Sequence, residues 1–408
     1  MANGELLQEG IYHAPGQRPP EHATFVFLRA RESHSAADVY GTLKQIWSVL
    51  QQLRQGRVPS VPGVTVPTGN LSSLIGYGYN IFTLQGIKKD RPASLGDDYR
   101  YLRPEVQGGG VFLRGSGLRY AEDVAVNQAT EDIVIQCIGE TRLSVTRPVV
   151  EIQTTLRGMT DPALEVAAVY TGFNRDDARS WIGFHDGISN IPSRHRWKAI
   201  ETKTRGWTKG GTYMSFIRIA VNLAGWERLT TLQQETAVGR DKVTGCPFLA
   251  VDGGGQPIPA QGCPVSGSAD ILDPANRRFV EPTAPAVNDQ VIIKSHVQRA
   301  NNAHSTDWSS RSSLRVYRQG YEFFETGNDA ADIRIGLNFI SFQDTPERLI
   351  RILTQDQWLG GTNFGGETDE MNPIPELRTL LTVRAGANFL VPPKDPHDKL
   401  PGRVLFES

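Results

Sequence analysis

The chain has 408 residues, of which 39% are hydrophobic and 21% are charged, and its formal net charge is −1. This is the composition of an ordinary globular protein, and it gives no electrostatic case for nucleic acid or an acidic membrane surface as a partner. No apolar run approaches the ~18 residues of a membrane helix, and the N-terminus MANGELLQEG carries no secretion signal. We therefore expect a cytoplasmic protein that works without nucleic acid or a membrane.

The first half is predicted to combine several strands with one long helix. Residues up to about Glu21 look like an arm, and Ala23–Ala30 is dense in β-branched and aromatic residues, which favours a strand. Ser35–Gln55 carries apolar residues at three- and four-residue steps, which predicts an amphipathic helix with Ser35 as its cap. Leu71–Phe82 and Asp132–Cys137 are further strand-like runs.

The second half begins a similar cycle. Thr212–Val221 is predicted to be a strand, and Gly225–Ala237 is helical. The later expected elements are the strands Gln290–Ile293, Leu314–Tyr317, Ile335–Phe342 and Ala387–Val391 and the helix Thr345–Gln357. Residues 246–288 are rich in Gly, Pro, Ala and Asp, which indicates a long insertion loop. Helices mixed with strands that do not alternate with them favour an α+β fold.

The three cysteines are Cys137, Cys246 and Cys263, and none belongs to a C-x-x-C pair. They are too few for a disulfide framework. Cys246 and Cys263 each lie in a Gly-Cys-Pro triplet and could bridge one another, but we expect free thiols in a reducing compartment.

Two segments carry side chains that could take part in catalysis or bind a metal. In Gly183-Phe184-His185-Asp186-Gly187, the Asp-Gly pair is more often a simple turn, so a functional role for Asp186 needs a partner elsewhere. The apolar run Val291–Ile293 leads to His296, and imidazole commonly holds the iron of haem. A histidine bonded to a backbone carbonyl at a strand end is the commoner situation.

Two arginines are candidates for binding an anion. If the strand continues to Arg318, alternation puts this residue on one face with Leu314 and Val316, from which it could point into a pocket. Arg240 lies in the turn Gly239–Lys242, whose two cations could bind an anion such as a propionate. The alternatives are an arginine paired with a surface carboxylate and a solvated helix end.

Taken together and in this order, these segments resemble the motifs of the dye-decolorizing peroxidase family. The matching segments are Gly183–Gly187 (G-x-x-D-G) followed by Asn190, Gly210–Gly245 (closing with G-R-x-K), the His296 segment, Arg315–Tyr321 (RxxRxGY), Gly336–Gln343 and Phe389–Pro393. Each motif alone is weakly specific, whereas the complete ordered set is very specific. The resemblance spans nearly the whole chain, from Gln8 onward.

The resemblance implies an α+β fold of two ferredoxin-like domains, residues 1–180 and 181–408, with antiparallel sheets and peripheral helices. It implies one haem b per chain, held mainly by the second domain, and reduction of hydrogen peroxide with oxidation of dyes, phenols or other one-electron donors through a ferryl intermediate. The chain could form a homo-oligomer.

The resemblance also implies roles for individual residues. His296 would bind the iron, with Asp344 or else Glu347 bonded to its other nitrogen. Arg240 and Arg318 would contact the cofactor. Asp186 would move a proton between the peroxide oxygens, and Arg318 would stabilise the charge on the leaving oxygen.

Other functions stay open at this point. A haem protein for iron release or transport would share the fold and the ligand but turn over little peroxide, and a haem-free interaction module would use the same motifs as turns and packing. Rival iron ligands are His185, His304 and the thiolates of Cys246 and Cys263. Tyr317, Tyr321 and Trp308 could pass electrons from bulky donors, although aromatic residues serve core packing more often.

Overall fold

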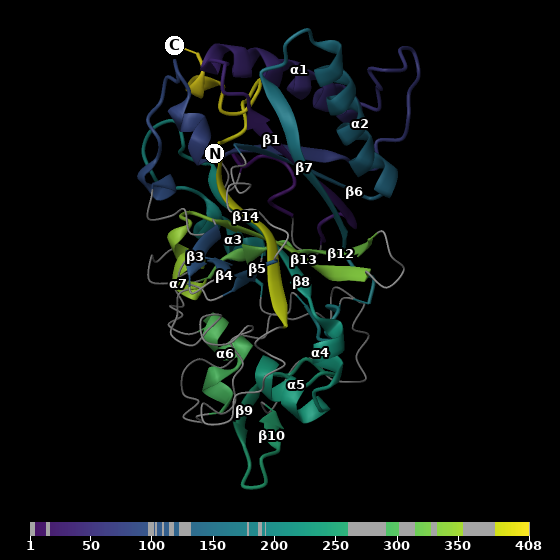
Figure 1. Ribbon diagram of the computed structural model, residues 1–408, viewed down its shortest axis with the longest axis vertical. Helices are drawn as coiled ribbons and strands as arrows, with labels where there is room; N and C mark the ends of the chain where they lie inside the picture. The colour runs from purple at the N-terminus through teal and green to yellow at the C-terminus, as the bar shows by residue number, and fades with distance from the viewer. Residues whose placement is uncertain are drawn as a thin grey trace.

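The computed structural model describes residues 5–13, 17–96, 102, 104–107, 110–113, 118–121, 132–177, 179–186, 190, 191, 193–259, 291–301, 315–327, 333–353 and 380–407. Figure 1 shows a central body of strands with helices toward both ends of the molecule. Within the described ranges, no helix is both long enough and apolar enough to cross a membrane.

The first half forms four antiparallel strands packed against two helices. In chain order these elements are β1 (His22–Ala30), α1 (Ala36–Arg54), β2 (Ser72–Tyr77), β6 (Ile133–Gly139), α2 (Arg142–Gly158) and β7 (Leu164–Phe173). The strands lie in the order β7-β1-β6-β2. Strand β1 follows the period of two, because Val26 and Leu28 pack in the cluster with α1 while Phe25 and Phe27 face the other way.

Helix α1 begins where its sequence predicts. The Ser35 side chain accepts a hydrogen bond from the Asp38 backbone, and the Asp38 side chain accepts one from Ser35, which forms a capping box. The apolar residues at three- and four-residue steps, such as Leu43, Ile46 and Leu50, are buried. The predicted strand Ala23–Ala30 and the predicted helix Ser35–Gln55 are thus confirmed to within a residue at each end.

The second half repeats this arrangement of strands. Its main elements are β8 (Thr212–Val221), α4 (Leu223–Glu227), α5 (Thr231–Val238), α6 (His296–Asn301), β12 (Tyr321–Thr326), β13 (Ile333–Gln343), α7 (Glu347–Leu353) and β14 (Leu381–Val391). The antiparallel pairings give the order β14-β8-β13-β12. In both halves the fourth strand therefore lies beside the first, followed by the third and the second.

Shorter elements extend this framework. They are β3 (Pro104–Gln107), β4 (Gly110–Leu113), β5 (Arg119–Tyr120), α3 (Ser193–Ile200), β9 (Phe248–Val251), β10 (Pro257–Pro259) and β11 (Tyr317–Arg318). Strand β5 pairs with β14, and β11 pairs with β13.

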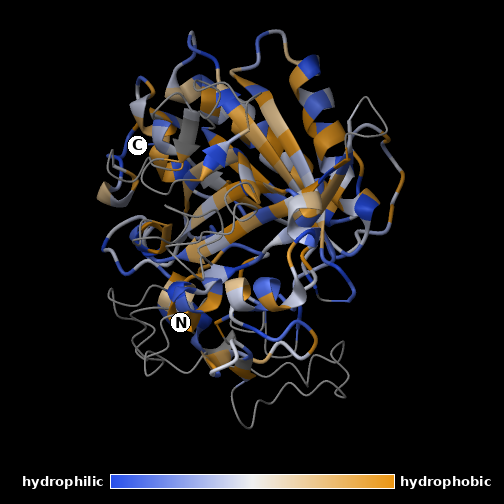
Figure 2. Cartoon of the chain, turned by 60° about the horizontal axis from the view of Figure 1, so that its bottom comes forward, coloured by the Kyte–Doolittle hydropathy of each residue, from blue (hydrophilic) through white to orange (hydrophobic). Residues whose placement is uncertain are grey.

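The two sets of strands meet at both edges. Tyr77 of β2 pairs with Leu390 of β14, and Phe173 of β7 pairs with Glu322 of β12, so eight strands form a closed ring. The inside of the ring is filled by apolar side chains, many of them aromatic. They include Phe25, Phe27, Phe216, Tyr321, Phe342 and Phe389. Figure 2 accordingly shows hydrophobic residues along the central strands.

A separate apolar cluster packs the second set of strands against its helices. It contains Ile217 of β8, Trp226 of α4, Val238 of α5, Leu349 of α7 and Val383 of β14. In Figure 1, helices α4, α5 and α6 lie together at the end of the molecule opposite α1 and α2. This cluster positions the candidate site.

Several predicted elements are wrong in kind or extent. Ile292–Lys294 is a 3-10 helix and not part of a strand, so His296 begins helix α6 instead of ending a strand. The segment predicted as one helix, Gly225–Ala237, is divided between two short helices, α4 and α5, and β14 is longer than predicted. Leu314, Gln290 and residues 354–357 lie outside the described residues.

The region from residue 246 also differs from the prediction. It opens with a hairpin of β9 and β10, and residues 260–290 lie outside the described part. Cys246 is disulfide-bonded, so the expected free thiol is wrong there, whereas Cys137 is free and buried. Cys263 lies outside the described residues.

Candidate active site

The structure brings Asp186 and Arg318 together from segments 132 residues apart. The Arg318 Nη1 atom lies 3.3 Å from Asp186 Oδ1. The two side chains keep 35% and 45% of their surface exposed, so a small molecule can reach them. This pairing supplies the partner that the Asp-Gly turn needs for a functional role.

Arg318 is held through its backbone. Asn190 Nδ2 donates to the Arg318 carbonyl oxygen at 2.6 Å, and the Arg318 N–H donates to Asn190 Oδ1 at 3.1 Å. Its neighbour Tyr317 is buried inside the ring, where it stacks on Phe342. Alternation along β11 therefore leaves Arg318 on the side where Asp186 lies.

Arg240 lies close to this pair and is buried, with 4% of its surface exposed. Its Nη1 atom donates to the Gly245 carbonyl oxygen at 2.7 Å. Burial, and then the positive charge of Arg318, lowers the pKa of Arg240 to about 10. An anionic group placed near both arginines would relieve this repulsion.

The segment that carries His296 packs closely against the C-terminal end of helix α5. Gly239 caps α5 in the left-handed conformation, with φ of 84°. A Cβ atom at this position would lie 2.2 Å from the Ser295 hydroxyl oxygen, so only glycine allows the two segments to approach so closely. His296 follows Ser295 directly, is half-buried and begins α6.

The four segments that carry these residues contribute to one apolar cluster. Phe184, Val238, Val297 and Val316 all belong to the cluster described above. Each lies within two residues of a predicted site residue, namely Asp186, Arg240, His296 and Arg318. Four of the predicted site residues thus adjoin the same apolar cluster.

The two candidates for the carboxylate behind His296 are placed differently. Asp344 receives two hydrogen bonds from Arg348, at 2.6 and 3.1 Å, and Lys203 lies 3.6 Å from it. Glu347 pairs with Arg351 one turn along α7. Within the described part of the chain, both carboxylates are therefore engaged by basic side chains.

Glu322 is a feature of the site that the sequence did not reveal. It is 7% exposed, and its carboxyl group accepts a hydrogen bond from the backbone of Trp181. Burial, and then the negative charge of Asp186, raises the pKa of Glu322 to about 8. A protonated carboxyl group therefore lies near Asp186 at neutral pH. The segment Tyr321–Thr326 was not predicted as a strand, so nothing indicated that this residue is buried.

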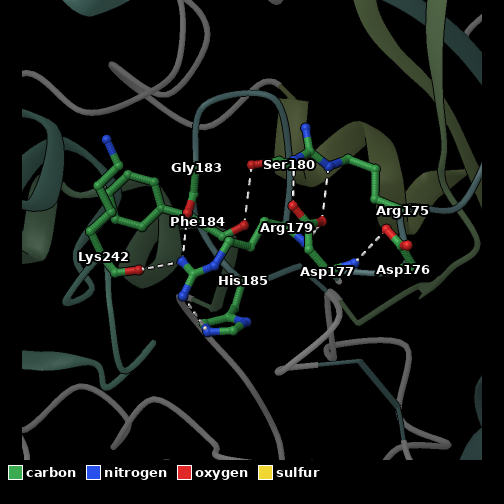
Figure 3. Close-up of polar contacts among 9 residues, drawn as sticks. All are labelled: Arg175, Asp176, Asp177, Arg179, Ser180, Gly183, Phe184, His185 and Lys242. Atoms are coloured by element: carbon green, nitrogen blue, oxygen red, sulfur yellow. Dashed lines mark hydrogen bonds and ion pairs between the residues drawn. The ribbon is translucent and has the colours of Figure 1, made fainter. Parts of the chain in front are cut away.

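The structure also locates some of the alternative iron ligands and candidate electron carriers. The His185 ring contacts the guanidinium group of Arg179 at 2.9 Å, as Figure 3 shows. Tyr317 and Tyr321 are fully buried in the ring, which agrees with core packing. His304 and Trp308 lie outside the described residues.

The donor set is suited to haem. A half-buried imidazole could bind iron, two neighbouring arginines could bind propionates, and an apolar cluster adjoins them.

The family model for the C-terminal part of Dyp-type peroxidases matches residues 177–396. A curated relative, deferrochelatase of Escherichia coli strain K12, is 25% identical over 174 residues. That match covers 41% of this chain and only about a third, 35%, of the length of the relative.

Three solved structures have the same fold. A DyP-type peroxidase from Cellulomonas bogoriensis is 20% identical with a TM-score of 0.67, covering 100% of both chains. Ferric DtpA from Streptomyces lividans is 18% identical with a TM-score of 0.68, covering 98% of this chain and 97% of its own. A DypB variant from Rhodococcus jostii, solved in complex with haem, is 17% identical with a TM-score of 0.61, covering 95% and 96%. The family match extends over more than half of the sequence, and the chain belongs to the Dyp-type peroxidase family.

Proposed function

We propose that this protein is a haem-dependent peroxidase that reduces hydrogen peroxide and oxidises dyes, phenols or other one-electron donors. The observation that carries the proposal is the contact of Asp186 with Arg318, with Arg240 beside them. Membership of the family supports it. His296 would bind the iron, and Arg240 and Arg318 would bind the anionic edge of the cofactor.

The chain's own residues would perform the proton chemistry. When bound, haem supplies an iron that takes up the two oxidising equivalents of peroxide and returns them to donors one at a time. Asp186 accepts the proton of one peroxide oxygen and delivers it to the other, which then leaves as water. Arg318 stabilises the negative charge that develops on this leaving oxygen. The protonated Glu322 keeps a second negative charge away from Asp186 at neutral pH.

The strand order supports two similar domains, of which one holds the cofactor. Both sets of four strands have the fourth-first-third-second order of a ferredoxin-like unit. We therefore propose two ferredoxin-like domains, residues 1–180 and 181–408, with haem held mainly by the second. All four candidate residues lie in that second part.

The test is the reaction of haem-loaded protein with hydrogen peroxide in a stopped-flow spectrometer. We expect a Soret change within milliseconds in the parent, and a rate constant lower by roughly 10²–10⁴ in Asp186→Asn, because that variant loses the proton carrier. The matched control is Asp176→Asn, since Asp176 is an exposed carboxylate in the preceding loop. It should react like the parent.

The match to a deferrochelatase is compatible with the alternative, haem binding for iron release or transport, without favouring it. Under that alternative, peroxide would only bleach the Soret band slowly, and Asp186→Asn would behave like the parent. Slow bleaching in the parent would overturn the peroxidase proposal, and a parent-like rate in Asp186→Asn would overturn the role of Asp186.

A further inference from the structure

A single arginine joins two turns of the candidate site. The Nη1 atom of Arg179 donates to the carbonyl oxygens of Gly183 at 2.7 Å and Lys242 at 2.6 Å. Its Nη2 atom donates to the carbonyl oxygen of Val243 at 3.0 Å and lies 2.9 Å from Nε2 of His185. Figure 3 shows this guanidinium group between Gly183, His185 and Lys242.

Each of the two turns is closed by bonds of its own. In the first turn, the Ser180 N–H donates to the Phe184 carbonyl oxygen at 2.8 Å. In the second, one Asp241 carboxylate oxygen accepts from the backbone N–H groups of Val243 and Thr244, at 3.0 and 2.6 Å. The Arg179 side chain therefore connects two units, each of which also has hydrogen bonds of its own.

The units joined in this way carry the site residues. Asp186 follows His185 directly at the end of the first unit, and Arg240 begins the second. The planar guanidinium group has donors in a fixed fork, so it can satisfy several carbonyl oxygens at once, which the ammonium group of a lysine on its flexible stem cannot do equally well. By contrast, Arg175 of the preceding loop pairs with Asp177 and lies over the Trp181 ring.

We propose that Arg179 is a positioning residue that holds Asp186 opposite Arg318 by fixing its turn to the turn that carries Arg240. The proposal rests on the function proposed above, because it assigns Asp186 the proton transfer. It follows that Arg179 acts on peroxide only through Asp186. Replacing Arg179 should therefore not lower the rate with peroxide any further in a variant that already lacks the Asp186 carboxylate.

The expected effect follows from how steeply proton transfer depends on geometry. A displacement of about 1 Å in a reacting group can lower a rate by roughly 10²-fold. We therefore expect Arg179→Gln to lower kcat/KM for peroxide by roughly 10–100-fold. Arg179→Lys keeps the charge and some of the carbonyl contacts, so it should lie between the parent and Arg179→Gln.

The experiment is a double-mutant cycle in haem-loaded protein, with Arg179→Gln, Asp186→Asn and both changes together. The control is Arg31→Gln, since Arg31 forms an ordinary ion pair with Glu165 in the first half of the chain. We expect Arg179→Gln to have less than about a twofold effect in the Asp186→Asn background, because coupled residues are not additive. Equal effects in both backgrounds would overturn the proposal, and so would parent-like rates in Arg179→Gln.

A second readout does not need turnover. Amide hydrogen exchange in peptides covering residues 180–186 and 241–245 should accelerate together in both Arg179 variants, while the rest of the chain is unchanged. If exchange rises in neither segment, the proposal is wrong even where rates fall. If the parent itself does not react with peroxide, the proposed function fails, and the exchange data still decide whether Arg179 connects the turns. Should Arg179→Gln not fold, Arg179→Lys carries both measurements.

Discussion

The buried carboxyl group of Glu322 should make the stability of the protein depend on pH. Its pKa rises from 4.5 to about 8 on folding. Between these values the unfolded chain has released a proton that the folded protein keeps, so the free energy of unfolding falls as the pH rises. One pKa unit corresponds to about 1.4 kcal/mol, which gives a loss on the order of 5 kcal/mol across this window as an upper limit.

Glu322→Gln isolates this effect. The amide has the same size, and its oxygen can still accept the Trp181 N–H, but it does not ionise. We would measure urea unfolding of haem-loaded parent and variant at pH 5 and pH 8. The variant should lose less stability than the parent between these pH values, by several kcal/mol.

The control for that comparison is Glu227→Gln, since Glu227 is exposed. Its pH dependence should follow that of the parent. If the stabilities of Glu322→Gln and the parent fall in parallel from pH 5 to pH 8, Glu322 is already ionised in the folded protein and the reasoning is refuted.

Three further changes test particular contacts. Gly239→Ala should lower the thermal unfolding midpoint because its Cβ would lie 2.2 Å from the Ser295 hydroxyl oxygen. Adding Ser295→Gly should restore part of the loss, and no recovery in the double variant would rule out this contact as the cause. Asn190→Ala removes both hydrogen bonds to the Arg318 backbone, so stopped-flow rates with peroxide should fall roughly tenfold while the Soret band is retained. An unchanged rate would show that Asn190 does not position Arg318. Ser35→Ala should reduce the free energy of unfolding in urea by about 1 kcal/mol without changing the peroxide rate, whereas no reduction would mean that the cap of α1 contributes nothing.

Local patterns predicted the elements whose own residues determine them. The helix Ser35–Gln55 and the strand Thr212–Val221 were predicted almost to the residue. Capping and apolar periodicity depend only on residues that are close together in the sequence. The predicted strand Gln290–Ile293 was wrong over its described residues, since a short apolar run suits a strand and a tight helical turn equally well. In the structure Ile292 packs against Phe248, which is far away in the sequence.

The sequence predicted those site residues whose type limits the chemistry they can perform. It did not predict which side chains form ion pairs with one another. Asp186 and Arg318 were expected as partners, and the structure places them in contact. Asp344 was expected behind His296, which stays a prediction, whereas its ion pair with Arg348 was not foreseen. This ion pair depends on where helix α7 begins, because the helix start determines which side chain lies beside Asp344. The order of motifs along the chain does not reveal that position.

The most direct test of the central claim is the absorption spectrum of haem-loaded His296→Ala, with and without added imidazole, beside the parent and His185→Ala. If His296 is the iron ligand, its variant loses the parental spectrum and free imidazole restores it, while His185→Ala keeps the parental spectrum. A parental spectrum in His296→Ala without imidazole would contradict the assignment, and with it the account of the site.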